Sequence, residues 1–594
     1  MPVSDDIRGS AASNGQGDQR AAASGVRFHP APGARRDEEG HAWAHRFPLA
    51  AVFFFALLAY SNSFTGSFVF DDIQHVRDNL RIRDLGALAS WAGYLPLRHR
   101  FVGYLTFAVN YALGRLDVSD YHLVNFLIHA VNAGLVYALV LLCFRTQRLR
   151  SSALAGSAQA VAFFAAALFA THPLQTQAVT YIVQRFTSLA ALFYLLTVVL
   201  FLRWRLHRAA GDGSRAKRTV LYAGLLLTAI LGMKTKETVF TVPLAVILCE
   251  LTFFEPLAWR RRLFLLPIAS TMLVIPLTLL SEVPVSATAL GQATRVQTTV
   301  SRLDYLLTQA PVVLTYLRML VWPTGQNLDH DFPVAHRLFE PRVLGSLLAL
   351  SALLAVAVLL YLRTALGRGR GAVDPGARLA GFGIAWFFLA LAVESSVIPI
   401  VDVIYEHRVY LPSVGIFCSV GVLLALLLRR IHARGAARAL VVLAAAASVV
   451  LGVATFLRNR TWASDIVIWA DAAQKSPGKS RPHMNLGTAL GAAGRLDEAS
   501  RELRRAVELD PASSYARAQL GVTLLALGRL AEAEPELREA LRLQPKDPEA
   551  LFNLGMVLLR TGRADDAKPL MKRFLEVAPP TYAAARRVAE RTQR

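Results

Sequence analysis

Long apolar runs set the limits on what this chain can fold into. The runs are about 17 to 22 residues long, which is the length that crosses a bilayer as one helix. Hydrophobic residues make up 54% of the 594 residues and charged residues only 18%, whereas a soluble protein carries about 25% charged residues. Mean hydropathy is +0.39. The sequence therefore predicts an all-α, polytopic membrane protein.

About eleven spans are expected from run length and from the basic loops between the runs. Their positions are near 48–64, 121–144, 154–171, 186–204, 219–233, 238–254, 263–281, 343–362, 379–398, 411–428 and 438–457. The stretch 302–322 is apolar but interrupted by polar residues. Counting it as a span would place the basic loop 363–378 outside, so we interpret it as an interfacial or re-entrant helix.

The net charge of +22 does not indicate nucleic-acid binding, because Arg and Lys concentrate in short loops between the apolar runs. This distribution is typical of the positive-inside rule, and it places the N-terminus in the cytoplasm. Residues 1–46 are polar, lack periodicity and are expected to form a disordered tail. High Ala, Arg and Gly content favours a bacterial origin, so the predicted location is a bacterial inner membrane.

Two adjacent carboxylates, Asp71 and Asp72, follow directly on the first span. The predicted topology places them on the non-cytoplasmic side together with other segments rich in polar residues. These segments are 94–120, His172-Pro173, Lys236-Glu237, 327–331 and Glu406-His407-Arg408. Their convergence on one side predicts a single outward-facing site.

A further set, His122, Asn125, His129 and Asn132, recurs at helical spacing and predicts a polar stripe facing other helices rather than a metal site. His172 is expected to cap a span end.

After residue 460 the sequence repeats every 34 residues. The repeated positions are Leu486, Leu520 and Leu554; Gly487, Gly521 and Gly555; Ala499, Ala533 and Ala567; and Pro511, Pro545 and Pro579. This period and these residue types are the tetratricopeptide signature. Trp469, Ala472 and Pro477 match a partial repeat before the first full one, and 582–594 is expected to be a capping helix. The fold class is therefore a membrane domain followed by an α-solenoid.

At this point the chain resembles the membrane O-mannosyltransferases that carry C-terminal tetratricopeptide repeats, and their bacterial relatives, within the GT-C type glycosyltransferases. The matching stretches are Phe70-Asp71-Asp72, Arg100 with Tyr104–Phe107 and Asn110-Tyr111, Tyr121–Asn125 with His129 and Asn132, His172–Thr176, Lys236–Thr238, Tyr316–Arg318, Glu394–Ser396 and Glu406–Pro412. Two positions depart from the family pattern: Phe101 stands where Pro is usual, and Gln177 where Glu is frequent.

The resemblance implies a sugar donor linked to polyprenyl phosphate. Asp71 or Asp72 would take the proton of the acceptor hydroxyl, with a preference for Asp72. The leaving phosphate needs cations or hydrogen-bond donors, and the candidates are Arg100, Lys236, His407 and Arg408. Glu237 and Glu406 would orient these cations. If a divalent cation (Mg²⁺ or Mn²⁺) takes part, the acidic pair is its expected ligand.

The predicted partners are the lipid-linked sugar, the bilayer and a protein or peptide acceptor held by the repeats. Residues 1–46 would form the tail, 47–460 the GT-C-like transmembrane domain and 461–594 the repeat domain. Two alternatives stay open: a non-enzymatic tetratricopeptide scaffold or assembly factor of the cell envelope, and a lipid-linked glycan ligase or polymerase.

Overall fold

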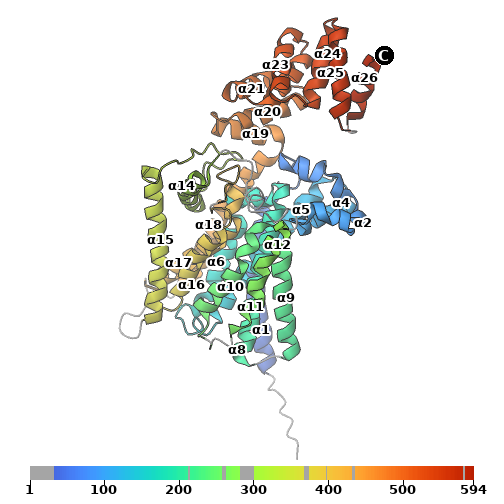
Figure 1. Ribbon diagram of the computed structural model, residues 1–594. Coiled ribbons are helices and arrows are strands. Elements are labelled where there is room, and N and C mark those ends of the chain that lie inside the picture. Colours follow the sequence, from blue (N-terminus) through green and yellow to red (C-terminus); the bar gives the residue numbers. More distant parts are fainter. Residues whose placement is uncertain are drawn as a thin grey trace, which may run out of the picture. The chain divides into compact units, whose positions relative to one another are not determined.

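The computed structural model describes residues 33–593, except 212–213, 257, 259–261, 281–299, 367–373, 397, 431–434 and 580–581. Every regular element in these ranges is a helix, which confirms the predicted all-α class (Figure 1). Contacts divide the chain into Met1–Phe47 and Pro48–Arg594. Most of the expected disordered tail lies outside the described residues, and helix α1 (Gly33–Tyr60) begins inside it. The expected division of the second unit at residue 460 stays a prediction.

The membrane part is a bundle of helices that occur at each predicted span. Its longer helices are α1, α4 (Phe101–Gly114), α5 (Val118–Phe144), α6 (Ala158–Thr171), α8 (Arg185–Ala210), α9 (Arg215–Met233), α10 (Val242–Phe253), α11 (Leu265–Ser270), α12 (Val274–Leu280), α14 (Arg302–Val321), α15 (Pro341–Leu366), α16 (Ala377–Leu391), α17 (Tyr410–Arg430) and α18 (Ala436–Asn459).

The predicted count of about eleven spans is not confirmed. Within the described residues, six helices are long and apolar enough to cross a membrane, and a bent pair at Ala155–Val179 raises this to seven. Four shorter apolar helices, including the last part of α1 and helix α16, add to them. Helix α14 is not among the six, and its interfacial placement stays a prediction.

Successive helices run between two ends of the bundle, and the basic loops gather at one of them. Arg148 donates to the carbonyl of Leu251 (2.8 Å), and Ser152 donates to Asp374 (2.6 Å). Helix α8 starts at the opposite end with Arg185, and α9 returns there to end at Met233. Short helices at that opposite end carry the expected site segments: η1 (Ile73–Arg77), η7 (Glu237–Thr241) and η10 (Glu406–Val409).

The polar stripe on α5 is buried, and Asn125, His129 and Asn132 bond neighbouring segments, whereas His122 has no hydrogen-bond partner among the described residues. Asn125 donates to the carbonyls of Val179 (3.1 Å) and Ile182 (3.2 Å), and His129 bonds the Tyr410 hydroxyl (2.8 Å). His172 caps the short helix η5 (Pro173–Gln175) by accepting from the backbone of Leu174. The bonded members of the stripe and His172 thus satisfy buried backbone groups between helices, as an interior without water requires.

The C-terminal part is a series of helices packed in antiparallel pairs. They are α19 (Asp465–Lys475), α20 (Ser480–Ala492), α21 (Leu496–Leu509), α22 (Ser514–Ala526), α23 (Leu530–Leu543), α24 (Pro548–Arg560), α25 (Ala564–Val577) and α26 (Ala583–Gln593). Gly494, Gly528 and Gly562, again 34 residues apart, have φ between 75° and 78°, a left-handed turn that glycine adopts at little cost. A Cβ at Gly521 would lie 2.5 Å from Leu537, so the repeated glycine permits close packing of the paired helices.

Candidate functional site

One cavity of about 640 Å³ collects most of the residues expected to carry the chemistry. Asp71, Arg100, Lys236, Glu237, His407 and Arg408 line it, whereas Asp72 and Glu406 are not among its lining residues. The polar residues come from segments far apart in sequence, each at the same end of the bundle. One part of the lining is apolar and includes Phe240, Ile275, Leu279, Val393, Ile398 and Ile400. The cavity therefore joins a charged part to a hydrophobic part.

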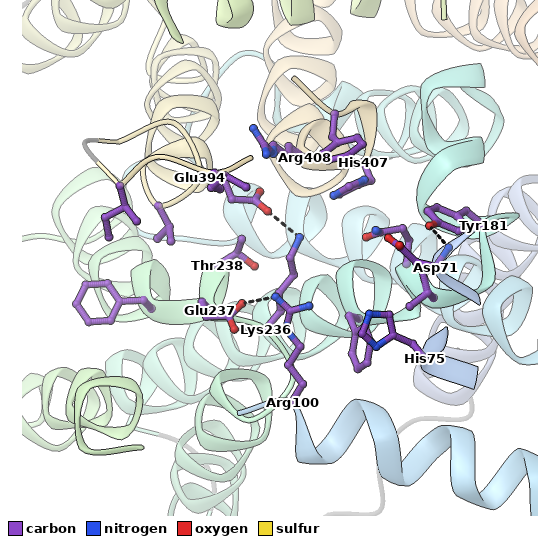
Figure 2. Close-up of a pocket in the computed structure, with 18 of the residues that line it drawn as sticks. Asp71, His75, Arg100, Tyr181, Lys236, Glu237, Thr238, Glu394, His407 and Arg408 are labelled. Atoms are coloured by element: carbon purple, nitrogen blue, oxygen red, sulfur yellow. Dashed lines mark hydrogen bonds and ion pairs between the residues drawn. The ribbon is translucent and has the colours of Figure 1, made fainter. Parts of the chain in front are cut away.

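The two adjacent carboxylates have different surroundings. Asp71 lines the cavity, and its backbone N–H donates to the Tyr181 hydroxyl (3.1 Å), which Figure 2 shows beside it. Asp72 is fully buried, and its carboxylate accepts the backbone N–H groups of Val69 (3.1 Å) and Val183 (2.6 Å). Asp71 is therefore the carboxyl group that lines the cavity, whereas Asp72 joins two backbone segments; which of the two is the base stays a prediction.

The environment of Asp71 shifts its pKa in the direction that makes its carboxylate a stronger proton acceptor. Burial raises the pKa of its carboxyl above the ordinary value, while the hydrogen bond with Tyr181 and the nearby charge of His75 act in the opposite direction. A base is most effective when its pKa lies near the working pH. His75 also lines the cavity, and its Nδ1 lies 3.0 Å from the Tyr104 hydroxyl.

Two ion pairs occupy the other side of the cavity. Lys236 donates to Glu394 (2.7 Å) and to the Thr187 hydroxyl (3.0 Å). Arg100 bonds Glu237 through two contacts of 3.1 and 3.3 Å. Figure 2 shows Lys236 reaching into the cavity between Glu394 and the Arg100–Glu237 pair. The prediction that Glu237 orients a cation fits this geometry.

Arg408 differs from these two cations in having no carboxylate partner within the described chain. It donates to the carbonyls of Val403 (3.1 Å) and Asp402 (2.8 Å), and it lies 3.4 Å from the Tyr305 hydroxyl. Neutral carbonyls fix the guanidinium without cancelling its charge. Arg408 is thus the cation of the lining best placed to attract an anion.

Gln177, the departure from the family pattern, holds His407. Its Oε1 accepts from the backbone N–H of His407 (2.7 Å) and lies 3.0 Å from His407 Nδ1. This contact requires the proton on Nδ1, so Nε2 is left as an acceptor in the neutral ring. The amide therefore sets the tautomer of a ring that lines the cavity.

Glu406 orients a loop rather than the cavity cations. Its carboxylate accepts from the backbone of Asn327 (2.5 Å) and from Gln326 (3.1 Å), and it lies 3.1 Å from His330 Nε2. Glu406 thereby fixes the segment before α15, outside the cavity lining. The role expected for it as a partner of His407 and Arg408 does not match this position.

The acidic pair does not fit a shared metal ion. Asp72 uses its carboxylate oxygens on two backbone donors and does not line the cavity. Among the described residues, no group of three or more His, Cys, Asp or Glu side chains could hold a metal. We therefore derive no step through a metal.

Residues that sequence reasoning did not assign also shape the cavity. Glu394 belongs to a quoted motif but was given no role, and here it pairs with Lys236. His75 follows Asp71 by four residues, a spacing that places two side chains on one face of a helical turn. That spacing was a signal that could have revealed His75.

Comparison with known proteins identifies the C-terminal repeats and finds relatives over most of the chain. The family described as Tetratricopeptide repeat matches residues 484–548 and 519–583. Protein O-mannosyl-transferase Tmtc3 of Drosophila melanogaster is 25% identical over 76% of this chain and 54% of its own length. Protein O-mannosyl-transferase Tmtc1 of the same species is 26% identical, covering 77% and 60%.

A third relative, Protein O-mannosyl-transferase F38B6.6 of Caenorhabditis elegans, is 23% identical over 77% of this chain and 61% of its own. A crystal structure of MamA protein aligns with 22% of this chain and 71% of that one, at 22% identity and a TM-score of 0.20. This chain thus spans between 54% and 61% of the length of the three curated relatives. Over about three quarters of its length it is a relative of named protein O-mannosyl-transferases, and its C-terminal part is an array of tetratricopeptide repeats.

Proposed function

We propose that this chain is a GT-C type glycosyltransferase that moves a hexose, mannose in the first instance, from a polyprenyl-phosphate donor to a hydroxyl group of a polypeptide. The reaction would take place on the non-cytoplasmic face of a bacterial inner membrane, with residues 47–460 as the transferase domain and 461–594 as the acceptor-binding domain. The observation that carries the proposal is the cavity, in which one unpaired carboxylate faces three cations beside an apolar wall.

The two parts of the cavity match the two parts of such a donor. Phe240, Ile275, Leu279 and Ile400 offer an apolar surface to the first units of a lipid chain. Arg408, Lys236 and Arg100 surround the space where a phosphate would lie. Two of these cations are already neutralised by Glu394 and Glu237, so Arg408 supplies the positive charge that an anionic donor needs.

In the proposed step, the acceptor oxygen attacks the anomeric carbon of the sugar while its proton passes to the Asp71 carboxylate. The bond between the anomeric carbon and the phosphate oxygen breaks, and its electron pair leaves with the polyprenyl phosphate. Arg408 and Lys236 stabilise the charge that develops on that phosphate. Since Glu237 and Glu394 are held in ion pairs, one carboxylate remains to act, which favours a single displacement with inversion at the anomeric carbon.

The repeat array supports a polypeptide acceptor. Asn485, Gln519 and Asn553 stand at the same position of three successive repeats, on helices α20, α22 and α24, which contact one another in sequence. All three side chains are partly buried. The amide groups of Gln519 and Asn553 each donate one bond to Glu549 (3.0 and 2.8 Å), whereas the Nδ2 of Asn485 has no hydrogen-bond partner among the described residues. A carboxamide offers one donor group and one acceptor, which complements a backbone peptide unit. Such a row suits an extended polypeptide on the inner face of the solenoid.

The test is transfer by the purified full-length chain in lipid nanodiscs. The reactants are polyprenyl-phosphate mannose and a peptide containing Ser and Thr. We expect a mass gain of one hexose on the peptide, removable by β-elimination and absent with Asp71→Asn. Transfer only to a lipid-linked glycan would establish the ligase alternative. If no polyprenyl-phosphate hexose were transferred to peptide or glycan, the proposed activity would be refuted in favour of the non-enzymatic scaffold.

A further inference from the structure

The residue before the proposed base has a backbone conformation that a phenylalanine rarely adopts. Phe70 has φ of 50°, in the left-handed region that is costly for a residue with a Cβ. Such a conformation persists only when surrounding contacts impose it, and it is often found at functional sites. Because Asp71 follows directly, the conformation of Phe70 determines where the Asp71 carboxylate points.

The contacts that hold Phe70 come from helices that follow the last membrane span. Its backbone N–H donates to the Asp465 carboxylate (3.3 Å). Its ring packs edge-on against Trp469, with centroids 5.0 Å apart and planes at 88°. The Arg481 guanidinium lies 6.0 Å from the ring centroid. Asp465 and Trp469 belong to α19, and Arg481 belongs to α20.

Arg481 also reaches the opposite side of the cavity through a chain of bonds. It forms ion pairs with Asp329 (2.5 Å) and Asp402 (2.6 Å). Asp402 in turn accepts from the Tyr405 hydroxyl (2.7 Å). Tyr405 lines the cavity and stacks on His407, with ring centroids 5.1 Å apart. One guanidinium therefore contacts the segments on both sides of the cavity.

The hydrophobic packing follows the same division. Trp469 and Leu486 belong to one buried cluster with Phe68, Val69 and Tyr181, beside the cavity. The next repeats pack in a separate cluster that contains Leu503, Leu520 and Leu537. Helices α19 and α20 are thus continuous with the core under the site, although their sequence belongs to the repeat pattern.

We infer that α19 and α20 belong to the active site, because they position its base. In this inference, which rests on the proposed function, Asp465, Trp469 and Arg481 are positioning residues that impose the left-handed conformation of Phe70 and so aim Asp71 at the acceptor hydroxyl. Arg481 links this clamp to Tyr405 and His407 across the cavity. The acceptor domain therefore completes the catalytic site in addition to binding the acceptor.

The charges around Asp71 give this inference a second readout. After burial, the groups that influence the pKa of Asp71 are Tyr181, His75, Arg481 and Asp402, and Arg481 lowers the pKa whereas Asp402 raises it; Asp72 is the adjacent carboxyl. Replacing Arg481 by Gln removes a lowering charge and leaves Asp402 with Lys479 (3.5 Å) as its remaining ion-pair partner. The loss of the lowering charge raises the pKa of Asp71, so the acidic limb of the kcat profile should move to higher pH.

The experiment compares Asp465→Ala, Trp469→Leu and Arg481→Gln in the full-length chain with the control Arg517→Gln. Arg517 is an arginine of the next repeat, on α22, paired with Glu536 (2.7 Å) outside the cavity. With a short peptide acceptor, we expect the three clamp variants to lose kcat on the order of 100-fold with little change in donor KM, since small misplacements of a reacting group have effects of this size. The control should match the wild type.

A coupled variant separates the clamp from general destabilisation. Glycine adopts the left-handed conformation at little cost, so Asp465→Ala should reduce kcat by a smaller factor in a Phe70→Gly background than in the wild type. Equal factors in the two backgrounds would overturn the inference, as would clamp variants that keep wild-type kcat and pH profile.

Hydrogen exchange tests the clamp without relying on activity. Amides of residues 69–73 should lose protection in Asp465→Ala and Trp469→Leu, and keep it in Arg517→Gln. Unchanged protection in the clamp variants would overturn the inference even in an active enzyme. Loss of protection in a chain that transfers no sugar would instead refute the proposed function and leave the clamp standing.

Discussion

The two sides of the cavity are built in different ways. On the cationic side, Lys236 lies between α9 and η7 and Arg100 precedes α4, and they are fixed by Glu394 and Glu237. On the acidic side, Asp71 stands alone in a short segment whose conformation depends on Asp465 and Trp469. The cationic side of the cavity is therefore held by residues that precede α19, whereas the segment that carries Asp71 depends on α19.

This difference suggests that one side of the cavity acts in ground-state binding and the other in the chemical step. Changes on the cationic side should act mainly on donor use, because those residues would surround the phosphate of the proposed donor. Changes on the acidic side should act on kcat and on its pH dependence.

The largest effect is expected for Asp71→Asn. An amide cannot accept the acceptor proton, and a general base contributes about 10² to 10⁴ in rate. Transfer to a peptide should fall by about 10³-fold, while donor affinity and the melting temperature stay at wild-type values. Steady-state kinetics and donor binding in nanodiscs measure both quantities. Near-normal transfer by this variant would remove Asp71 from the chemistry.

Arg408→Gln should come next and act on the other side. Loss of one charged donor to a developing anion costs on the order of 100-fold, and we expect that loss in kcat/KM for the donor. Arg408→Lys should recover part of it, because the charge returns without the guanidinium fork. If the peptide KM rose instead, with donor kinetics intact, the assignment of this side to the donor would fail.

Asp72→Ala should affect the fold more than the chemistry. The substitution leaves the buried N–H groups of Val69 and Val183 without their acceptor, at a cost of about 1 to 3 kcal/mol in the free energy of unfolding. Thermal unfolding should show a lower melting temperature, and kcat per folded molecule should stay near the wild-type value. A stable but inactive Asp72→Ala enzyme would instead support Asp72 as the base, as expected from the family resemblance.

The smallest effect is expected for Tyr181→Phe, which tests how the acidic side of the cavity controls the pKa of Asp71. Burial raises the pKa of Asp71, and the hydrogen bond from Tyr181 lowers it, so removing the hydroxyl should raise the pKa further. Since the base must be deprotonated, the acidic limb of the kcat/KM profile should move to higher pH, with the plateau at high pH unchanged. A shift toward lower pH would contradict the assigned direction.

The sequence was informative wherever topology decides the outcome. Arg100, Lys236 and His407 were expected together because successive spans return their ends to the same side of the bundle, and the cavity does collect them. The tetratricopeptide period was visible for a similar reason, since each repeat packs on its neighbours with the same residues at the same places.

The sequence was uninformative where a single turn or a distant contact decides the outcome. Asp71 and Asp72 are the same residue type at adjacent positions. The different directions of their side chains depend on the left-handed φ of Phe70, which no local sequence motif predicts. Glu406 likewise lies one residue from the cavity lining and bonds a loop about 80 positions earlier. The packing of Trp469 under the site could not be inferred, because a repeat pattern describes local packing only.

The bond between Phe70 and Asp465 joins residues 395 positions apart in the chain. At a synthesis rate of about 5 to 20 residues per second, Asp465 is made about 20 to 80 s after Phe70. During that interval the segment before Asp71 lacks its clamp, although the first membrane helix has already been made. If the chain is the proposed transferase, the order of synthesis delays catalytic competence until α19 has been translated.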